Sequence, residues 1–263
     1  MKNKTVKILA GAVILFLLML ASWLFLQKKT TAPPLEKAAT PALNMLTTEF
    51  TYSVVEKGQK RKSTAVIRRK GDVYLFNSTE TAAGKKKVVV AATLNPDYET
   101  LDWKLNNPEK NIKVTAKRVN DRIILTGAFD KKENNRKEIG IDGRKWLQIY
   151  QLGLMKFALN GKKDESFEFW TLNPDDPGSA MVLFANQKGA QAIEVNGEKT
   201  AADSLKIGLA GLLSVFWSGD YWFRLSDGIF IKAKVSGDIF VELKGEQAKE
   251  RGTARPAPKS AKK

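Results

Sequence analysis

Residues 8–26, ILAGAVILFLLMLASWLFL, form an apolar stretch that constrains the arrangement of everything after it. The stretch contains no charged residue and no proline. As a helix rising about 1.5 Å per residue it reaches about 28 Å, close to the roughly 30 Å of hydrocarbon in a bilayer. We therefore predict a single transmembrane anchor at 8–26, behind a short N-terminus at 1–7, with the rest of the chain held at a membrane surface.

A cleaved secretory signal peptide is the alternative interpretation, because Lys2, Lys4 and Lys7 supply the basic start that such a peptide needs. The apolar run is longer than the usual core of about 7–15 residues, and no cleavage site of the small-x-small kind follows it. Leu20-Ala21-Ser22 resembles the start of a lipoprotein cleavage box, but Trp23 occupies the position of the lipidated cysteine. These features favour an uncleaved anchor.

The orientation of the anchor is set weakly by charge, because three lysines lie on each side of it. A short basic N-terminus before a first apolar segment is typical of a signal-anchor, and long downstream domains cross the membrane largely regardless of their charge. We expect a single-pass protein of the cell membrane with a cytoplasmic N-terminus and an extracytoplasmic, periplasmic C-terminal domain.

The composition limits the chemistry of that domain. Hydrophobic residues make up 43% of the chain, which is too many for a disordered domain. There is no cysteine and no histidine, so thiolate catalysis, cysteine-bound metal and the commonest general base are all absent. The sequence contains no phosphate-binding loop, EF-hand or dinucleotide fingerprint, and we expect no cofactor and no metal.

The formal net charge of the chain is +16, and part of the excess lies in its two ends. In a cytosolic protein such a charge would point to nucleic acid. At an extracytoplasmic membrane surface we expect no nucleic acid partner, and anionic lipid headgroups, lipopolysaccharide or acidic wall polymer are the more plausible partners. A solvated basic surface without any partner is the other interpretation.

A change in periodicity marks the start of the folded domain, which we predict at 47–245. The linker before it, 27–46, contains three prolines, a composition typical of a stiff extended spacer. In the domain, apolar and polar residues alternate with a period of two, most clearly over 112–117, so one face of each strand is buried and the other is solvated. The polar and basic segment 246–263 is predicted to be a disordered tail.

One segment departs from the strand pattern. Between Lys145 and Leu159, apolar residues recur at spacings of three and four, and Asn160-Gly161 follows as a helix-ending signal. The sequence therefore predicts a mainly β domain, an antiparallel sheet with one packed amphipathic helix.

Acidic residues are the remaining candidates for catalysis, since a hydrolase of this composition would need two converging carboxylates. Asp102, Asp142, Asp175 and Asp176 are available, but most lie in turn-like sequence where acidic residues are common. The pentapeptide Thr-Leu-Asn-Pro-Asp, present at 93–97 and 171–175, indicates either two related β halves or shared turn chemistry. We expect a protein that is not an enzyme and has no catalytic residues.

Aromatic residues are concentrated in the second half of the chain, where they form either an ordinary core or the lining of an apolar cavity. In a strongly curved sheet closed by one helix, a lipid-like ligand would fit among them. The candidate lining residues are Trp146, Phe157, Phe169, Trp170, Trp217 and Trp222.

The stretch 192–237 resembles the C-terminal half of an uncharacterised bacterial envelope family whose fold is related to the periplasmic lipoprotein carriers. The similar elements are the Gly197-Glu198 pair, the alternating strand at 205–209, a tryptophan before a Tyr-Trp strand, and Asp-Gly before another alternating strand. The resemblance implies a curved, unclosed antiparallel barrel, a half-barrel, wrapped on a helix, and binding of an apolar ligand.

These observations lead to two expectations about function. The first is a membrane-anchored extracytoplasmic protein that binds a lipid, a lipoprotein or another amphipathic ligand. The alternative is a non-enzymatic envelope scaffold that holds wall polymer or a partner protein through its basic surface and its tail.

Overall fold

The computed structural model describes residues 47–211 and 217–248. By its internal contacts the chain divides into two compact units, 1–38 and 39–263, and all described residues belong to the second unit. The predicted N-terminus, anchor and linker lie outside the described residues, as does most of the predicted tail. Over the described residues, no helix combines the length and the apolar character that a membrane crossing requires.

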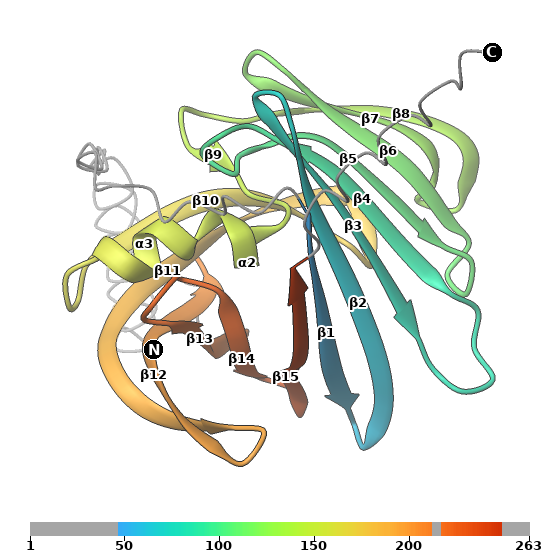
Figure 1. Ribbon diagram of the computed structural model, residues 1–263. Helices are drawn as coiled ribbons and strands as arrows, with labels where there is room; N and C mark the ends of the chain where they lie inside the picture. Colours follow the sequence, from blue (N-terminus) through green and yellow to red (C-terminus); the bar gives the residue numbers. More distant parts are fainter. Residues whose placement is uncertain (1–46, 212–216, 249–263) are drawn as a thin grey trace, which may run out of the picture. The chain divides into compact units, whose positions relative to one another are not determined.

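The described residues form one large sheet with two wings that meet at its centre (Figure 1). The first wing comprises β1 (Thr47–Glu56), β2 (Gln59–Lys70), β3 (Val73–Thr81), β4 (Val88–Leu94), β5 (Thr100–Asn107), β6 (Ile112–Val119), β7 (Arg122–Phe129) and β8 (Lys132–Gly140). The second wing comprises β9 (Lys145–Trp146), β10 (Ser166–Asn173), β11 (Asp176–Val195), β12 (Glu198–Leu209), β13 (Ser218–Arg224), β14 (Phe230–Val235) and β15 (Ile239–Ala248).

The order of the strands shows that the sheet is open. Within each wing every strand pairs with its neighbours in sequence. The wings are joined by β1 and β15, which pair antiparallel from Thr48 opposite Ala248 to Glu56 opposite Ile239. The edge strands β8 and β9 do not pair with each other, and the two-residue β9 is parallel to β10. The predicted mainly β fold, with a large open antiparallel sheet, is confirmed. Strand β15 includes residues 246–248 of the segment assigned to the tail.

Alternation of residue types places the core on one face of the sheet. In β6, Ile112, Val114 and Ala116 are buried, whereas Lys113 and Lys117 are exposed. Because successive side chains of a strand point to opposite faces, this pattern buries the concave face and leaves the convex face solvated.

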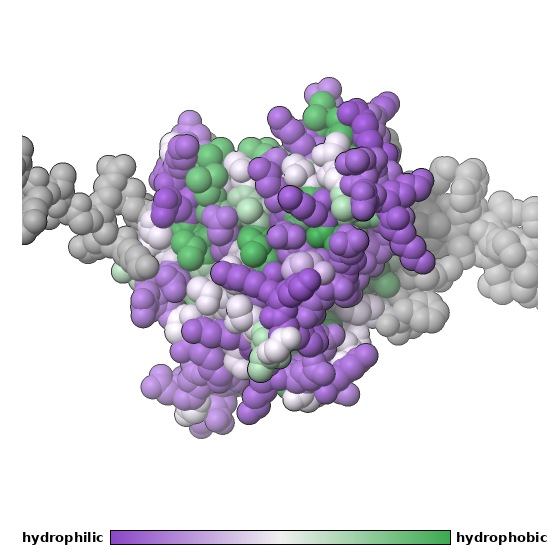
Figure 2. Space-filling model, turned by 90° about the vertical axis from the view of Figure 1, so that its right-hand side faces the viewer, coloured by the Kyte–Doolittle hydropathy of each residue, from purple (hydrophilic) through white to green (hydrophobic). Residues whose placement is uncertain are grey.

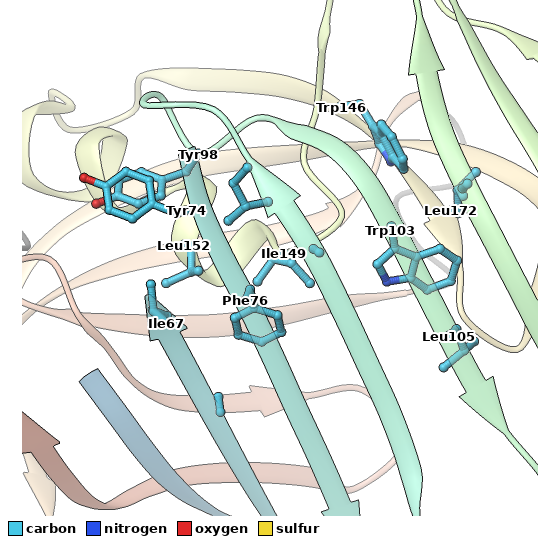
Figure 3. Close-up of a cluster of buried hydrophobic side chains, with 14 of the residues drawn as sticks. Ile67, Tyr74, Phe76, Tyr98, Trp103, Leu105, Trp146, Ile149, Leu152 and Leu172 are labelled. Carbon is cyan, nitrogen blue, oxygen red and sulfur yellow. The ribbon is translucent and has the colours of Figure 1, made fainter. Parts of the chain in front are cut away.

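Two short helices, α2 (Tyr150–Gly153) and α3 (Met155–Asn160), lie against the concave face and contribute to both halves of the core. Leu152 and Met155 pack in the cluster that contains Tyr74, Trp103 and the other large side chains of the first wing (Figure 3). Leu154 and Phe157 pack in a second cluster, made mostly by β10 to β14. The helices therefore contribute side chains to both core clusters.

The single helix predicted from Lys145 to Leu159 is too long, because its first residues form β9 and Leu154 separates α2 from α3. Gly153 lies so close to the side chain of Leu147 that an added Cβ would approach Leu147 Cδ2 to 2.8 Å. This tight turn explains the break, since the backbone folds back onto Leu147 instead of continuing one helical axis.

A buried glutamine joins the two wings next to the helices. The backbone N–H of Gln148 donates to Thr100 Oγ1 of β5 at 2.9 Å. Its side chain donates to the carbonyl of Leu172 in β10 at 3.0 Å and accepts from the N–H of Leu172 at 2.8 Å. The indole of Trp146 also donates to Gln148 Oε1, at 3.1 Å. Gln148 thus pairs buried polar groups that have no access to water.

Candidate functional site

A pocket of about 270 Å³ lies between the tip of the β11–β12 hairpin and the strands β13 to β15. Its apolar walls come from three different strands, and polar side chains lie among them. The pocket is lined by Val195, Asn196, Glu198, Thr200, Arg224, Ile231 and Leu243.

The hairpin tip reaches this position because β11 and β12 are long and bend. The pairing register shifts between Gln187 and Gly189, and Gly189 has a φ of +101°, which favours glycine. At the tip, Asn196 and Gly197 have φ values of 55° and 82°, as a two-residue Asn-Gly hairpin turn requires.

Three hydrogen bonds hold the tip against β14 and β15. Asn196 Nδ2 donates to the carbonyl of Leu243 at 2.8 Å, and the N–H of Asn196 donates to Glu242 Oε1 at 3.3 Å. Lys232 Nζ donates to the carbonyl of Glu194 at 2.8 Å. Contacts between segments far apart in the sequence therefore form the walls of the pocket, which is partly open to solvent.

Arg224 is the basic side chain of the pocket, and its charge is already compensated. Its Nη2 lies 2.6 Å from Asp227 Oδ2 and 2.8 Å from Glu246 Oε2, and its Nε is 3.0 Å from Asp227 Oδ1. The hydrogen bonds that Arg224 donates to Asp227 and to Glu246 raise the pKa of Arg224, although partial burial lowers it. With Glu198 also present, the pocket combines polar and apolar surface in about equal parts with an excess of negative charge.

The six predicted lining residues lie outside this pocket. Trp146, Phe157 and Phe169 are almost fully buried, with exposed fractions of 0%, 4% and 0%. Phe157 and Phe169 are brought together through Phe167, whose ring centroid lies 5.7 and 6.1 Å from theirs. Trp146 belongs to the first cluster.

The other three predicted residues are half-buried: Trp170 lies in β10, Trp222 in β13, and Trp217 directly before β13. Trp217 packs against the second core cluster, whereas Trp170 and Trp222 pack against the first. Trp170 donates from Nε1 to Asp142 Oδ1 at 2.9 Å. The structure thus brings only part of the predicted set together.

The acidic residues considered for catalysis are engaged in separate local contacts. Asp142 accepts from Trp170, Asp175 pairs with Lys110 at 2.6 Å, and Asp102 lies on the convex side of β5 opposite Lys117. Asp176 approaches Asp130, and burial together with this neighbouring carboxyl raises the pKa of Asp130. Over residues 47–211 and 217–248, no group of three or more acidic side chains is arranged to hold a metal ion.

Sequence reasoning missed the pocket residues. The signals for them were Asn196-Gly197 as a hairpin turn and the unusual length of the strands on either side of it. The sequence does not show which strands the hairpin reaches, because Val195, Arg224 and Leu243 approach one another only through the pairing of distant strands.

Comparison with solved structures shows a likeness in fold. A β-barrel-like protein of a domain of unknown function, DUF1849, from Brucella abortus is 11% identical, with a TM-score of 0.51 over 78% of this chain and 99% of that chain. The hypothetical lipoprotein YmcC from Escherichia coli (K12) is 10% identical, with a TM-score of 0.32 over 86% of this chain and 92% of that chain. No known protein family and no curated protein matches the sequence. A barrel-like fold shared with another uncharacterised protein is therefore established, and the relation to lipoprotein carriers stays a prediction.

Proposed function

We propose that this chain is a membrane-anchored extracytoplasmic protein without enzymatic activity, which binds an amphipathic ligand in the pocket beneath the β11–β12 hairpin tip. The observation that carries the proposal is the pocket itself, because apolar side chains from three strands meet there beside polar groups. Ligand sites in proteins are concave and mostly apolar, with a few polar groups that fix orientation. The predicted anchor at 8–26 would hold this pocket near a membrane.

The volume of the pocket limits the ligand. A volume of about 270 Å³ lies just below the range of roughly 300–1,000 Å³ that is usual for small-molecule sites. This is room for a segment of an acyl chain or a small ring system, and too little for a whole two-chain lipid. The six predicted aromatic residues would then support the site from the core without lining this pocket.

The charges around the pocket indicate the polar end of the ligand. Arg224 is neutralised by Asp227 and Glu246, and Glu198 adds a further negative charge. An anionic headgroup would therefore meet repulsion, whereas an uncharged or cationic end would be tolerated. We expect neutral single-chain amphiphiles to bind in preference to fatty acids of the same chain length.

The test uses the unit 39–263, which is compact by its internal contacts. Calorimetric titration with decanoyl glycerol should give saturable binding, and decanoate should bind more weakly. Ile231→Trp fills the pocket and should lower the affinity for decanoyl glycerol at least tenfold. Ile124→Trp, on the convex side of β7, is the matched control and should bind as the original protein does.

Two results would contradict the proposal. One is the absence of binding to any apolar probe, together with native mass spectra that show no copurified amphiphile. The other is equal affinity of the Ile231→Trp and original proteins, which would place any binding elsewhere.

The alternative function is a scaffold that holds wall polymer or a partner protein through its basic surface and tail. The feature that favours it is the segment 249–263, in which six basic residues accompany a single acidic residue. Deleting 249–263 should abolish salt-sensitive binding of such a scaffold and leave pocket binding unchanged.

A further inference from the structure

Two neighbouring turns of the first wing carry a concentration of lysines, which we call the lysine tip. One turn joins β1 to β2, and the other joins β3 to β4. Lys85 Nζ of the second turn donates to Gln59 Oε1 of the first at 3.3 Å, so the two turns lie side by side. The lysine tip comprises Lys57, Lys60, Lys62, Lys85, Lys86 and Lys87.

The positive charge of the lysine tip is not compensated by the residues around it. All six side chains belong to exposed residues, and none has a carboxylate within 4.0 Å among the described residues. The nearby Glu56 and Glu80 are instead bound by Arg61, at 2.6 and 2.8 Å. Asp238, beside Lys57, and Glu109, near Arg61, are further acidic residues of this end, and neither forms an ion pair with the tip among the described residues. The free charge is therefore available to a partner.

The shape of the lysine tip suits a flat partner. Lys57-Gly58 forms a two-residue turn with φ values of 47° and 77°, and the other turn contains the small residues Ala82, Ala83 and Gly84. These turns project from the end of the sheet, at the lower right of Figure 1, and the lower part of the same side in Figure 2 is mostly hydrophilic. A projecting pair of turns can touch a surface, whereas a bound polymer chain would need a groove.

Both ends of the described chain leave the sheet far from the lysine tip. Thr47, where β1 begins, lies opposite Arg68, and Thr48 lies opposite Ala248, where β15 ends. The tip lies at the other end of β1, and ten residues at about 3.3 Å each separate the two ends by about 30 Å. The preceding and following segments are thus attached at the opposite end from the tip.

We propose that the lysine tip docks on the surface of a bilayer that contains anionic phospholipids. Lysines on exposed turns act as separate point charges, which respond to the diffuse negative potential of such a surface without requiring fixed pairing geometry. The absence of large apolar side chains on either turn makes this docking electrostatic and reversible. The lysine tip and the pocket are separate, so this proposal stands or falls independently of the proposed ligand.

The test compares two variants with equal loss of charge, in the full chain held in phosphatidylcholine nanodiscs. Lys85→Gln, Lys86→Gln and Lys87→Gln are combined in the tip variant. Lys104→Gln, Lys113→Gln and Lys117→Gln are combined in the control, because these exposed lysines of the convex face also lack ion pairs. Binding to vesicles of phosphatidylglycerol and phosphatidylcholine is measured by flotation at several salt concentrations.

The original protein should bind the anionic vesicles and not pure phosphatidylcholine vesicles. The tip variant should lose about a hundredfold in affinity, because each lysine near an anionic surface contributes about fivefold. The control should lose less than about threefold, and circular dichroism should show that both variants are folded.

Equal losses in the two variants would overturn the proposal, since net charge would then explain the binding. Unchanged binding of the tip variant would also overturn it. Binding of the tip to an acidic wall polymer, with no binding to anionic vesicles, would replace the bilayer by a polymer as the partner.

Discussion

The two wings of the sheet bury different kinds of groups, although they are parts of one structure. The first wing is a meander of consecutive strands whose concave face is filled by large apolar side chains such as Tyr74, Phe76 and Trp103. The second wing contains most of the buried polar residues of the described chain, among them Gln148, Gln187 and Asp203. It also contains the two helices and the strongly bent β11–β12 hairpin.

This difference in buried groups indicates which wing of the sheet can form a binding site. The first wing, although its register also shifts between β4 and β5 and between β7 and β8, buries few polar groups, among them Thr48 and Thr100. The second wing, with its register shifts and its folded-over hairpin, creates a pocket and requires buried hydrogen bonds to compensate for its irregularity. The first wing therefore carries the charged turns, and the second contains the pocket in which we have proposed ligand binding.

The largest expected effect follows from removing a large side chain of the first wing. Trp103→Ala should lower the free energy of unfolding by about 3–5 kcal/mol, because the indole is almost fully buried and its removal leaves a cavity. Phe169→Ala in the second wing is the matched variant. Both should shift one common transition in chemical denaturation followed by circular dichroism, since β1 and β15 join the wings. Two separate transitions would show that the wings unfold independently.

A smaller loss is expected at the junction between the wings. Gln148→Leu should cost about 3 kcal/mol, since it leaves the buried indole N–H of Trp146 and the N–H of Leu172 without a partner. Gln187→Leu should cost about 1 kcal/mol, because the loss of its side-chain hydrogen bonds to the carbonyl of Ala158 and to the Asp203 carboxyl is partly offset by removal of its unpaired, buried Oε1. Urea denaturation measures both values, and an equal cost would show that Gln148 has no special role at the junction.

A stabilising change is expected at Asp203 in the second wing. Burial raises the pKa of Asp203, an effect only partly opposed by hydrogen bonds from the N–H of Ser204 and the side chain of Gln187. A raised pKa in the folded state means that ionised Asp203 destabilises the fold at neutral pH, and that this cost disappears as the pH falls through the folded pKa to the unfolded value. Asp203→Asn should therefore raise the melting temperature at pH 7 and should give no gain near pH 3. A lower melting temperature at pH 7 would contradict this explanation.

The smallest effect is expected for an ion pair between the first wing and the helices. Lys156 Nζ lies 2.6 Å from Asp97 Oδ1, and this hydrogen bond lowers the pKa of Asp97. The stabilisation is present above the unfolded pKa and is lost as the pH falls through the folded pKa. Asp97 is largely exposed, so Asp97→Asn should cost about 0.5 kcal/mol at pH 7 and nothing at pH 2. A cost that persists at pH 2 would indicate a packing role.

The strands with alternating burial could be predicted from the sequence, and those without it could not. The pattern at 112–117 predicts β6 correctly because its two faces meet different environments. Strand β8, KENNRKEIG, shows no such alternation. It is an edge strand with polar or charged residues on both faces, so neither face is buried and its sequence carries no period of two. The amphipathic pattern at 145–159 likewise predicted one helix where contacts with both core clusters break it into two.

The repeated pentapeptide is explained by turn chemistry. Asn95 Oδ1 accepts from the N–H of Asp97 at 2.9 Å, and Asn173 Oδ1 accepts from the N–H of Asp175 at 3.0 Å. The same side-chain turn thus follows both strands. The candidate site was less predictable. The lining residues were predicted from the high density of aromatic residues in the second half of the chain, whereas the pocket depends on which distant strands the β11–β12 hairpin reaches.

The pairing of the first strand with the last has a consequence for biosynthesis. Since Thr48 lies opposite Ala248, β1 has no partner on one side until the ribosome has made almost the whole domain. A nascent chain in this condition folds late, so it stays unfolded long enough to pass through a translocation pore. It also exposes the unpaired edge of β1, which can cause aggregation. A premature stop codon that removes only β15 would leave this edge of β1 permanently unpaired.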